Sequence, residues 1–235
     1  GTKRGRDLFT ALKETSKKKP VIVLKAGKTK EGTHAVASHT GSMAGEPLIY
    51  SGMIKQAGAL EAHDIDELFD YAKIFSQPVT TGDRVQIITN GGGFGVLATD
   101  AVIQEGLALA TMDKKYKNEV KAALPEYATV SNPLDVTGMA TSEHYAKAIR
   151  CCIADKNVDI LLAIILFQTT SLSSDIINTI LAAQGKKPVI VCSTGSEFSE
   201  IHKKILEEGG IPVYLTPSRA VKALKAMNTY ASKTR

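Results

Sequence analysis

Short apolar runs rich in valine and isoleucine alternate along this chain with longer amphipathic stretches. Such runs are typical of strands buried on both faces of a parallel sheet, and the amphipathic stretches are typical of the helices that cover the sheet. The alternation therefore predicts an α/β fold built on parallel sheets. We expect strands near residues 20–25, 85–89, 107–110, 159–167, 188–192 and 212–215, and helices near residues 6–18, 46–57, 65–76, 94–105, 114–123, 141–154, 173–184, 197–208 and 217–229.

A turn-rich segment at residues 78–83 interrupts the alternation. It contains Pro78 and Gly82, residue types that commonly mark turns and linkers. We therefore predict two domains, over residues 1–79 and 80–235.

The hexapeptide Lys-Lys-Pro-Val-Ile-Val occurs twice, at residues 18–23 and 186–191. Similar elements follow each copy, which indicates two similar α/β units in tandem, although a common strand entry can also recur by coincidence. The first unit has one clear strand and a weak one near residues 59–61. Since so small a sheet cannot bury both of its faces, we expect this unit to be incomplete at its N-terminus. Its missing strands should come from residues upstream of Gly1, on another segment or chain.

Basic residues crowd the two ends of the chain, whose formal net charge is +5. We interpret them as solvated helix faces, because charge balance bears on solubility and association rather than on fold. Aromatic residues make up only 6% of the chain, which argues against stacking on bases or sugars. The sequence shows no nucleic-acid-binding motif and no apolar run of membrane length. We therefore predict neither a nucleic-acid partner nor a membrane partner.

Three cysteines, Cys151, Cys152 and Cys192, cannot form an even disulfide framework. We interpret them as buried thiols in a reducing compartment. The cysteines and histidines have no metal-ligand spacing, so we predict no metal site. The N-terminus lacks the layout of a secretory signal, and we expect a cytoplasmic protein.

A glycine-rich run follows the expected strand at residues 85–89 and leads directly into a helix. Successive glycines allow a sharp turn and let an anion approach the backbone N–H groups, while the helix adds its positive N-terminal end. We predict a phosphate-binding turn formed by Asn90, Gly91, Gly92, Gly93 and Phe94. A tight strand-to-helix turn without a ligand is the structural alternative.

The same run satisfies the dinucleotide fingerprint G-x-G-x-x-A with Gly93, Gly95 and Ala98. Asp113 lies at about the distance along the chain at which this fingerprint places its ribose-binding acid, about 20 residues on. A dinucleotide-binding (NAD or FAD) oxidoreductase domain is therefore an alternative reading of this segment.

His39 lies in a run of small residues, Ser-His-Thr-Gly-Ser-Met-Ala-Gly, at residues 38–45. We expect this run to be a loop in which small neighbours, including Gly41 and Ser42, let a reacting group approach the imidazole. A phosphoryl carrier needs such a histidine, whereas a dinucleotide-binding domain does not. We therefore predict that His39 is the catalytic nucleophile. A histidine that only makes local hydrogen bonds is the alternative.

Two further polar runs follow expected strands or turns. Asp135 is a carboxylate between apolar residues and needs a partner, so we expect it to cap a helix, brace a loop or contact substrate. The run at residues 193–197 resembles a helix cap with an oxyanion pocket, and we interpret it mainly as a helix start.

Taken together, these residues resemble the ADP-forming acyl-CoA (acetyl-CoA) synthetases of the succinyl-CoA synthetase superfamily, over essentially the whole chain. The segment from Lys19 through Gly45, with Ser-His-Thr-Gly-Ser-Met-Ala-Gly at residues 38–45, resembles the family's phosphohistidine segment. Residues 90–95 resemble the phosphate-binding turn of one of its two power helices, and residues 132–135 resemble a further signature of the ligase region.

The resemblance implies tandem flavodoxin-like, succinyl-CoA-synthetase-domain-like units, and a reaction through a phosphohistidine at His39. Acyl-CoA and phosphate give an acyl phosphate, which phosphorylates the histidine, and the histidine then passes its phosphoryl group to ADP. The resemblance also implies CoA and ATP or ADP with Mg²⁺, bound mostly outside this chain. It implies a separate CoA-binding domain and an ATP-grasp domain or subunit as partners, in a hetero-oligomer, so this chain alone should not turn over. A catalytically inactive acyltransferase-type relative is the remaining alternative.

Overall fold

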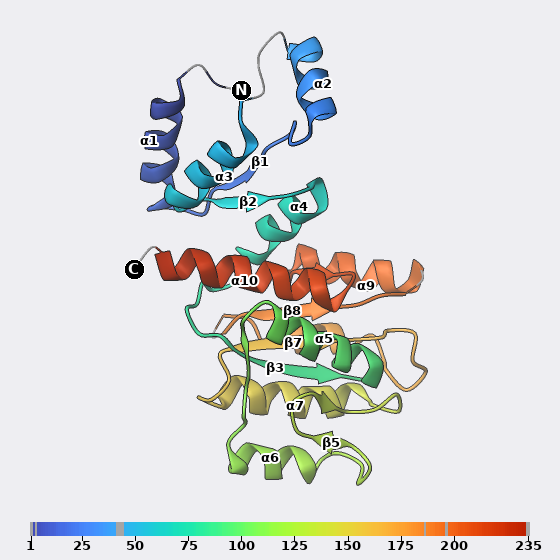
Figure 1. The fold of residues 1–235 in the computed structure, drawn as a ribbon. Coiled ribbons are helices and arrows are strands. Elements are labelled where there is room, and N and C mark those ends of the chain that lie inside the picture. The colour runs from blue at the N-terminus through green and yellow to red at the C-terminus, as the bar shows by residue number, and fades with distance from the viewer. Residues whose placement is uncertain (1, 3, 41–44, 186, 196, 234–235) are drawn as a thin grey trace. The chain divides into compact units, whose positions relative to one another are not determined.

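The computed structural model describes residues 2, 4–40, 45–185, 187–195 and 197–233 of the 235-residue chain. The chain divides into two compact units (Figure 1). Unit 1 comprises Gly1–Ala72 and Thr229–Arg235, and unit 2 comprises Lys73–Asn228.

Unit 1 is a small α/β unit whose two strands pair in parallel, with Ile22 opposite Leu60 and Leu24 opposite Ala62. Gly58 turns the chain into the second strand with φ of 80°, a backbone conformation that suits glycine. Pro47 begins a helix at a position where its missing N–H is not needed. The elements are α1 (Gly5–Ser16), β1 (Ile22–Leu24), α2 (Lys30–Thr40), α3 (Pro47–Gln56), β2 (Leu60–Ala62) and α4 (Ile65–Ile74).

Unit 2 is built on one sheet in which β3, β7 and β8 lie side by side in this order and run parallel (Figure 1). Strand β9 pairs in parallel with β8. On its other side, β3 pairs with β4 and β6, and β5 is the one antiparallel strand of the described sheet. The strands are β3 (Arg84–Thr89), β4 (Ala108–Leu109), β5 (Thr129–Val130), β6 (Leu134–Asp135), β7 (Ile160–Ile164), β8 (Val189–Cys192) and β9 (Val213–Tyr214). The helices are α5 (Gly92–Gln104), α6 (Lys114–Lys121), α7 (Ser142–Ala154), α8 (Ile176–Leu181), α9 (Glu197–Glu208) and α10 (Pro217–Lys233). The residues of α10 from Thr229 onward belong to unit 1.

The central strands are buried on both faces, which explains why they are continuously apolar. All five residues of β7 and all four of β8 are buried. Strand residues Leu161, Ala163 and Val189 pack in one cluster with helix residues Tyr145 and Ile176. The predicted α/β fold with parallel sheets is confirmed.

The side chain of Asn132 links strands on the side of β3 where β4 pairs with the start of β3 and β6 pairs with its end. Its side-chain Nδ2 donates to the carbonyl oxygens of Val85 and Ala110 at 2.7 and 3.0 Å, and its Oδ1 accepts from the N–H of Ile87 at 3.1 Å. The amide thereby replaces backbone ladder bonds where the neighbouring strands are too short to make them. The Asn132–Pro133 peptide bond is cis.

Three elements were not predicted from the sequence, α2, β5 and β6. Helix α8 is also shorter than the stretch expected at residues 173–184, because residues 165–175 form a loop before it. Helix α10 continues four residues beyond the expected end at residue 229. The three cysteines are buried and unpaired, as expected of structural thiols.

Candidate active site

The carboxyl ends of the parallel strands of unit 2 gather several loops at one edge of the sheet. Strand β3 lies at the switch point of the topology, with β4 and β6 on one side and β7 on the other. Ligands of open α/β sheets usually bind outside the carboxyl ends of the strands at such a point. The turn after β3, which contains the predicted phosphate-binding residues, is therefore the place where a ligand is expected.

The N-terminus of α5 presents unused hydrogen-bond donors. Gly91 is its N-cap and has no side chain to cap the helix. The N–H groups of Phe94 and Gly95 both donate to the Gly91 carbonyl, at 3.0 and 3.2 Å. The N–H groups of Gly92 and Gly93 make no hydrogen bond with the described part of the chain. Two free N–H groups at the positive end of a helix favour an anion.

The glycines of the turn serve different purposes. A Cβ atom at Gly91 would lie 2.7 Å from the Leu166 side chain, and one at Gly95 would lie 3.0 Å from the Thr89 side chain. These two glycines allow close packing of the helix onto the sheet. A Cβ atom at Gly93 would meet nothing within 4 Å among the described residues, so the space beside Gly93 is open to a ligand.

Asn90 ties the turn to the loop that follows β7. Its Oδ1 accepts from the N–H of Leu166 at 2.9 Å, and its Nδ2 donates to the Leu166 carbonyl and to Thr169 Oγ1, both at 3.2 Å. The side chain is almost fully buried. Asn90 therefore holds the shape of the turn rather than offering its amide to a ligand.

Asp135 lies beside the same helix N-terminus, because it ends β6 opposite Thr89 of β3. Its Oδ1 accepts from the N–H of Thr137 at 2.8 Å, where the backbone takes a positive φ of 74°. A Cβ atom at Gly92 would lie 3.0 Å from Asp135 Oδ2. Burial, and to a lesser degree the charge of Asp135, raise the pKa of Tyr145, whose hydroxyl donates to the Ile164 carbonyl. Asp135 thus braces the loop and brings negative charge to the positive end of α5.

His39 lies in a helix that extends to Thr40, which corrects the expectation of a loop for residues 38–40; residues 41–44 of the expected loop lie outside the described residues. The helix is α2, and His39 belongs to its last turn. Gly41 and Ser42 lie outside the described residues. His39 belongs to unit 1 and the Asn90 turn to unit 2. Within unit 2, the structure brings Asp135 close to the turn at residues 90–94. His39 is part of the other unit.

The other histidines have structural surroundings or are exposed. His63 Nδ1 lies 2.8 Å from Glu67 Oε2, and His144 completes the capping box of α7 with Thr141. His202 stacks on Phe167 and lies against Phe198. His34 lies on α2, five residues before His39, and is exposed.

Two other predicted features have local explanations. Asp113 caps α6 by accepting from the N–H of Lys115 at 2.8 Å, so its carboxylate has a role without a ribose. Helix α9 begins at Glu197, in agreement with the interpretation of residues 193–197 as a helix start. In this run, Ser193 is buried and its hydroxyl has no partner among the described residues.

Sequence reasoning missed the loop after β7 as part of the site. Leu166 and Thr169 define one wall of the turn through their bonds with Asn90. The sequence carries no local signal for this contact, since the residues lie 76 and 79 positions from Asn90.

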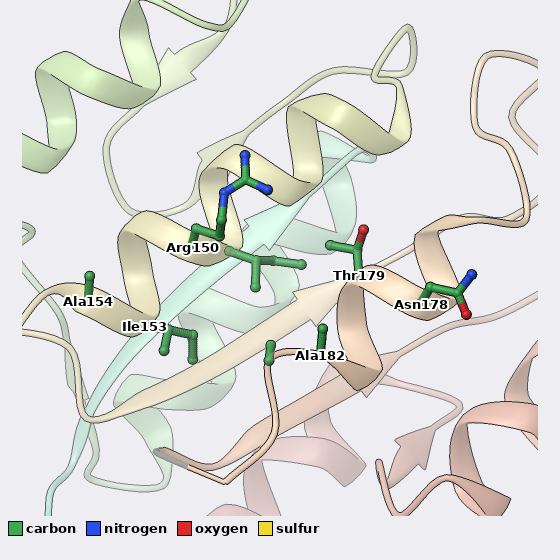
Figure 2. Close-up of a pocket in the computed structure, with 8 residues that line it drawn as sticks. Arg150, Ile153, Ala154, Asn178, Thr179 and Ala182 are labelled. Atoms are coloured by element: carbon green, nitrogen blue, oxygen red, sulfur yellow. The ribbon is translucent and has the colours of Figure 1, made fainter.

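A pocket of about 580 Å³ lies elsewhere in unit 2, between α7 and α8 (Figure 2). None of the residues that line it belongs to the predicted site. In Figure 2, Ile153 and Ala182 face the space between the helices, and the guanidinium of Arg150 points away from it. The lining residues are Ile149, Arg150, Ile153, Ala154, Asn178, Thr179, Ala182 and Ala183.

Among the described residues, no three His, Cys, Asp or Glu side chains are grouped so that they could hold a metal ion. Within the same residues, none of the helices has the length and apolar character needed to span a bilayer.

Two family models cover most of the chain. Residues 1–75 match the succinyl-CoA ligase like flavodoxin domain, and residues 85–234 match the ligase-CoA domain. These matched ranges follow each other in the same order as the two structural units.

Similar proteins have the same two-domain segment within longer chains. The chain is 41% identical over 233 residues to subunit alpha of acetate–CoA ligase [ADP-forming] II of Pyrococcus furiosus, covering 97% of this chain and 51% of the relative. It is 42% identical to the alpha subunit of enzyme I of the same organism, covering 97% of this chain and 50% of the relative. The chain thus spans about half the length of these relatives.

A solved structure agrees with the computed one. Acetyl-coenzyme A synthetase 1 of Ca. Korarchaeum cryptofilum, in complex with phosphate and ADP, superimposes with a TM-score of 0.88 at 34% identity. The match covers 99% of this chain and 51% of that one. The chain therefore belongs to the ligase-CoA domain family, as a region like the alpha subunit of ADP-forming acetyl-CoA synthetases.

Proposed function

We propose that this chain is the part of an ADP-forming acyl-CoA synthetase that carries a phosphoryl group on His39. The observation that supports this most directly is the pair of free N–H groups, of Gly92 and Gly93, at the N-terminus of α5. They suit a phosphoryl group, which carries negative charge on several oxygens. The similar acetyl-coenzyme A synthetase was solved with phosphate and ADP, which agrees with this chemistry.

The proposed reaction has three steps, and His39 takes part in the last two. Phosphate displaces CoA from the acyl thioester and gives an acyl phosphate. A neutral imidazole nitrogen of His39 then attacks the phosphorus, the bond to the acyl oxygen breaks, and the organic acid leaves. Finally an oxygen of the terminal phosphate of ADP attacks the phosphohistidine, which gives ATP and restores the imidazole.

The residues of the turn would act by positioning and by electrostatics. In the proposal, the N–H groups of Gly92 and Gly93 donate to the phosphoryl oxygens, and Phe94 continues the first turn of the helix. Gly91 and Asn90 maintain the shape of the turn, and Asp135 braces the adjacent loop. Donors fixed in advance in this way stabilise developing negative charge without reorganisation.

The position of His39 in α2 adds a requirement to this proposal. The last turn of a helix carries partial negative charge, which does not favour an added phosphoryl group. The positive end of α5 would act in the opposite sense and favour the phosphorylated ring. Transfer would therefore be favoured when His39 meets the turn, with Gly41 and Ser42 as small neighbours on its C-terminal side.

The remaining parts of the reaction are proposed to lie outside the 235 residues. A CoA-binding domain and an ATP-grasp domain or beta subunit would supply the sites for CoA and for ADP with Mg²⁺, in a hetero-oligomer. This agrees with the chain spanning about half of relatives that are named alpha subunits. Acetate is the acid named for these relatives, and we propose a small organic acid as the substrate, in the cytoplasm.

The test is to locate phosphate after the chain is combined with its partner domains and incubated with ATP. We expect one phosphohistidine, stable in base and labile in acid, at His39 by mass spectrometry. His39→Ala should abolish the label. His34→Ala is the matched control, because His34 lies on the same helix and is exposed, and it should leave the label unchanged. A label that persists in His39→Ala would refute the assignment.

A further inference from the structure

The two basic ends of the chain meet in unit 1. Lys13 and Lys17 of α1, Lys55 of α3 and Lys233 of α10 all line one pocket of about 310 Å³. Ser16, Gln56, Ala57 and Gly58 complete its lining. More than 200 residues separate Lys13 from Lys233 in the sequence. All four lysines are exposed, as expected of solvated helix faces, and the fold in addition brings them together around one pocket.

The positive charge of this pocket is largely unbalanced. Lys17 pairs with Glu14 at 2.9 Å. Lys13, Lys55 and Lys233 form no ion pair with any residue that the structure describes. Glu61 lines an adjoining pocket that shares Lys55 and Lys233, but it already pairs with Lys28 at 3.0 Å. Burial and the nearby Lys55 lower the pKa of Lys233, as expected for a lysine without an acidic partner.

The ends of the helices explain only part of this charge. Lys13 and Lys55 lie in the last turns of α1 and α3, and Lys233 ends α10. Lysines at such positions interact favourably with the partial negative charge of the helix end, about half a unit charge per helix. The three helix ends together therefore balance less than two of the four lysine charges. Glu14 balances one more, so a net positive charge remains at the pocket.

Ser16 provides a second, independent observation. It lines the pocket and is only 2% exposed, and its hydroxyl oxygen has no hydrogen-bond partner in the described structure. Buried hydroxyl groups are nearly always hydrogen-bonded. A ligand that accepts a hydrogen bond and carries negative charge would satisfy both the hydroxyl and the lysines.

The pocket lies at the opposite edge of the β1–β2 sheet from the start of α2. Lys17 precedes β1 and Gly58 precedes β2, and since the two strands are parallel, both belong to the amino edge. Helix α2, with His39, follows the carboxyl end of β1. The concave shape and small volume suit a small molecule rather than the surface of a macromolecule.

We propose that this pocket is a second anion site, which binds a small molecule that carries two adjacent phosphoryl groups. Several flexible ammonium groups around a hydroxyl donor match the many acceptor oxygens of a diphosphate. The diphosphate is either free pyrophosphate or part of a nucleotide. This inference does not depend on phosphoryl chemistry at His39.

The test is lysine footprinting of the complete protein with an acetylating reagent, read by mass spectrometry, with inorganic pyrophosphate or ADP as the probe. We expect saturable protection of Lys13, Lys55 and Lys233, with labelling slowed at least about fivefold, as charge-assisted binding should produce. Lys18 and Lys19 follow α1, are exposed and do not line the pocket, so their labelling should not change. The stronger of the two probes identifies the source of the diphosphate.

Matched variants separate the pocket from general electrostatics. Lys55→Gln with Lys233→Gln should abolish the protection of Lys13. Lys18→Gln with Lys19→Gln removes the same charge nearby and should preserve it. Equal protection of Lys18 and Lys19, or no protection by either probe, would overturn the proposal. Neither pair of variants touches His39, so its phosphorylation in the same samples tests the proposed function separately.

Discussion

Asn90 stands at the end of β3 and makes three hydrogen bonds to residues that follow β7. Asn90→Ala would leave the N–H of Leu166 without its acceptor and Thr169 Oγ1 without the donor Nδ2, whereas the Leu166 carbonyl would still accept from Thr169. We expect it to lower the free energy of unfolding by about 2–3 kcal/mol, the cost typical of buried unsatisfied groups. Chemical denaturation monitored by circular dichroism measures the change.

Asn90→Asp is the informative companion variant. It keeps the acceptor for the Leu166 N–H but replaces the donating Nδ2 with an oxygen, which would face the Leu166 carbonyl. It should therefore be no more stable than Asn90→Ala near neutral pH. An Asn90→Asp protein as stable as the parent would show that these hydrogen bonds do not hold the loop.

Asp159 gives a prediction about pH. Arg84 donates to both carboxylate oxygens, at 2.7 and 2.8 Å, and holds the pKa of Asp159 below its ordinary value. Because the pKa is lower in the folded than in the unfolded state, the pair stabilises the fold above the ordinary pKa of an aspartate, and this contribution disappears as the pH falls through the folded value. Asp159→Asn should cost about 1 kcal/mol near neutral pH, since Arg84 is partly exposed.

The measurement is the free energy of unfolding of parent and variant across the acid range. The difference between them should shrink as the pH falls below 3.8, the ordinary pKa of an aspartate. Glu208→Gln is the control, because Glu208 and its partner Lys204 are both exposed and 4.0 Å apart, and it should change little at any pH. A difference that does not depend on pH would contradict the assignment.

At the scale of elements, helix α5 contains two glycines in different surroundings: Gly95 packs closely against its neighbours, and Gly93 faces open space. Gly95→Ala places a Cβ atom 3.0 Å from Thr89 and 3.3 Å from Pro133, which should destabilise the fold by about 1–3 kcal/mol through overpacking. Gly93→Ala meets open space, so it should preserve stability. It would nevertheless crowd the two free N–H groups, and we expect the rate of phosphoryl transfer to fall at least about tenfold.

Denaturation and single-turnover phosphorylation of both variants test this pair. The contrast matters more than either value, because Gly95→Ala should impair the fold and Gly93→Ala should impair only the transfer. Transfer at the parent rate in Gly93→Ala would count against phosphate binding at α5.

Helix α2 shows why some elements escape sequence analysis. Its residues 30–38 are exposed or half-buried, so they carry no apolar stripe of helical period. Gly32 and the β-branched residues Thr33 and Val36 also lower its helix propensity. Strands β5 and β6 have two residues each, which is too short for a detectable alternation. The strongly apolar β7 and β8, by contrast, were readily predicted.

At the scale of the whole molecule, the two units differ in how much sheet they bury. Unit 1 has two strands within the described residues, and the side chains of β1 are half-buried. The described part of unit 2 has seven strands, with β7 and β8 fully buried. Small sheets are marginally stable, so backbone amides of β1 should exchange with solvent much faster than those of β7. Hydrogen exchange read by mass spectrometry measures this, and equal protection of both strands would contradict it.

The sequence by itself determined the class of fold and the position of most elements, because hydrophobic period and run length are local properties that burial imposes on each segment. The sequence also located the turn at residues 90–95 and led to the prediction that His39 is the catalytic nucleophile. The boundary between residues 79 and 80 and the catalytic role of His39 are still predictions.

Only the tertiary structure decided which distant residues meet. Order in a sheet and the packing of helices are set by the whole chain, and no local pattern encodes them. For this reason the bonds of Asn90 to Leu166, the proximity of Asp135 to Gly92, and the convergence of Lys13 with Lys233 could not be read from spacing. Each of these contacts joins residues that are distant in the sequence, and they become neighbours only when the chain folds.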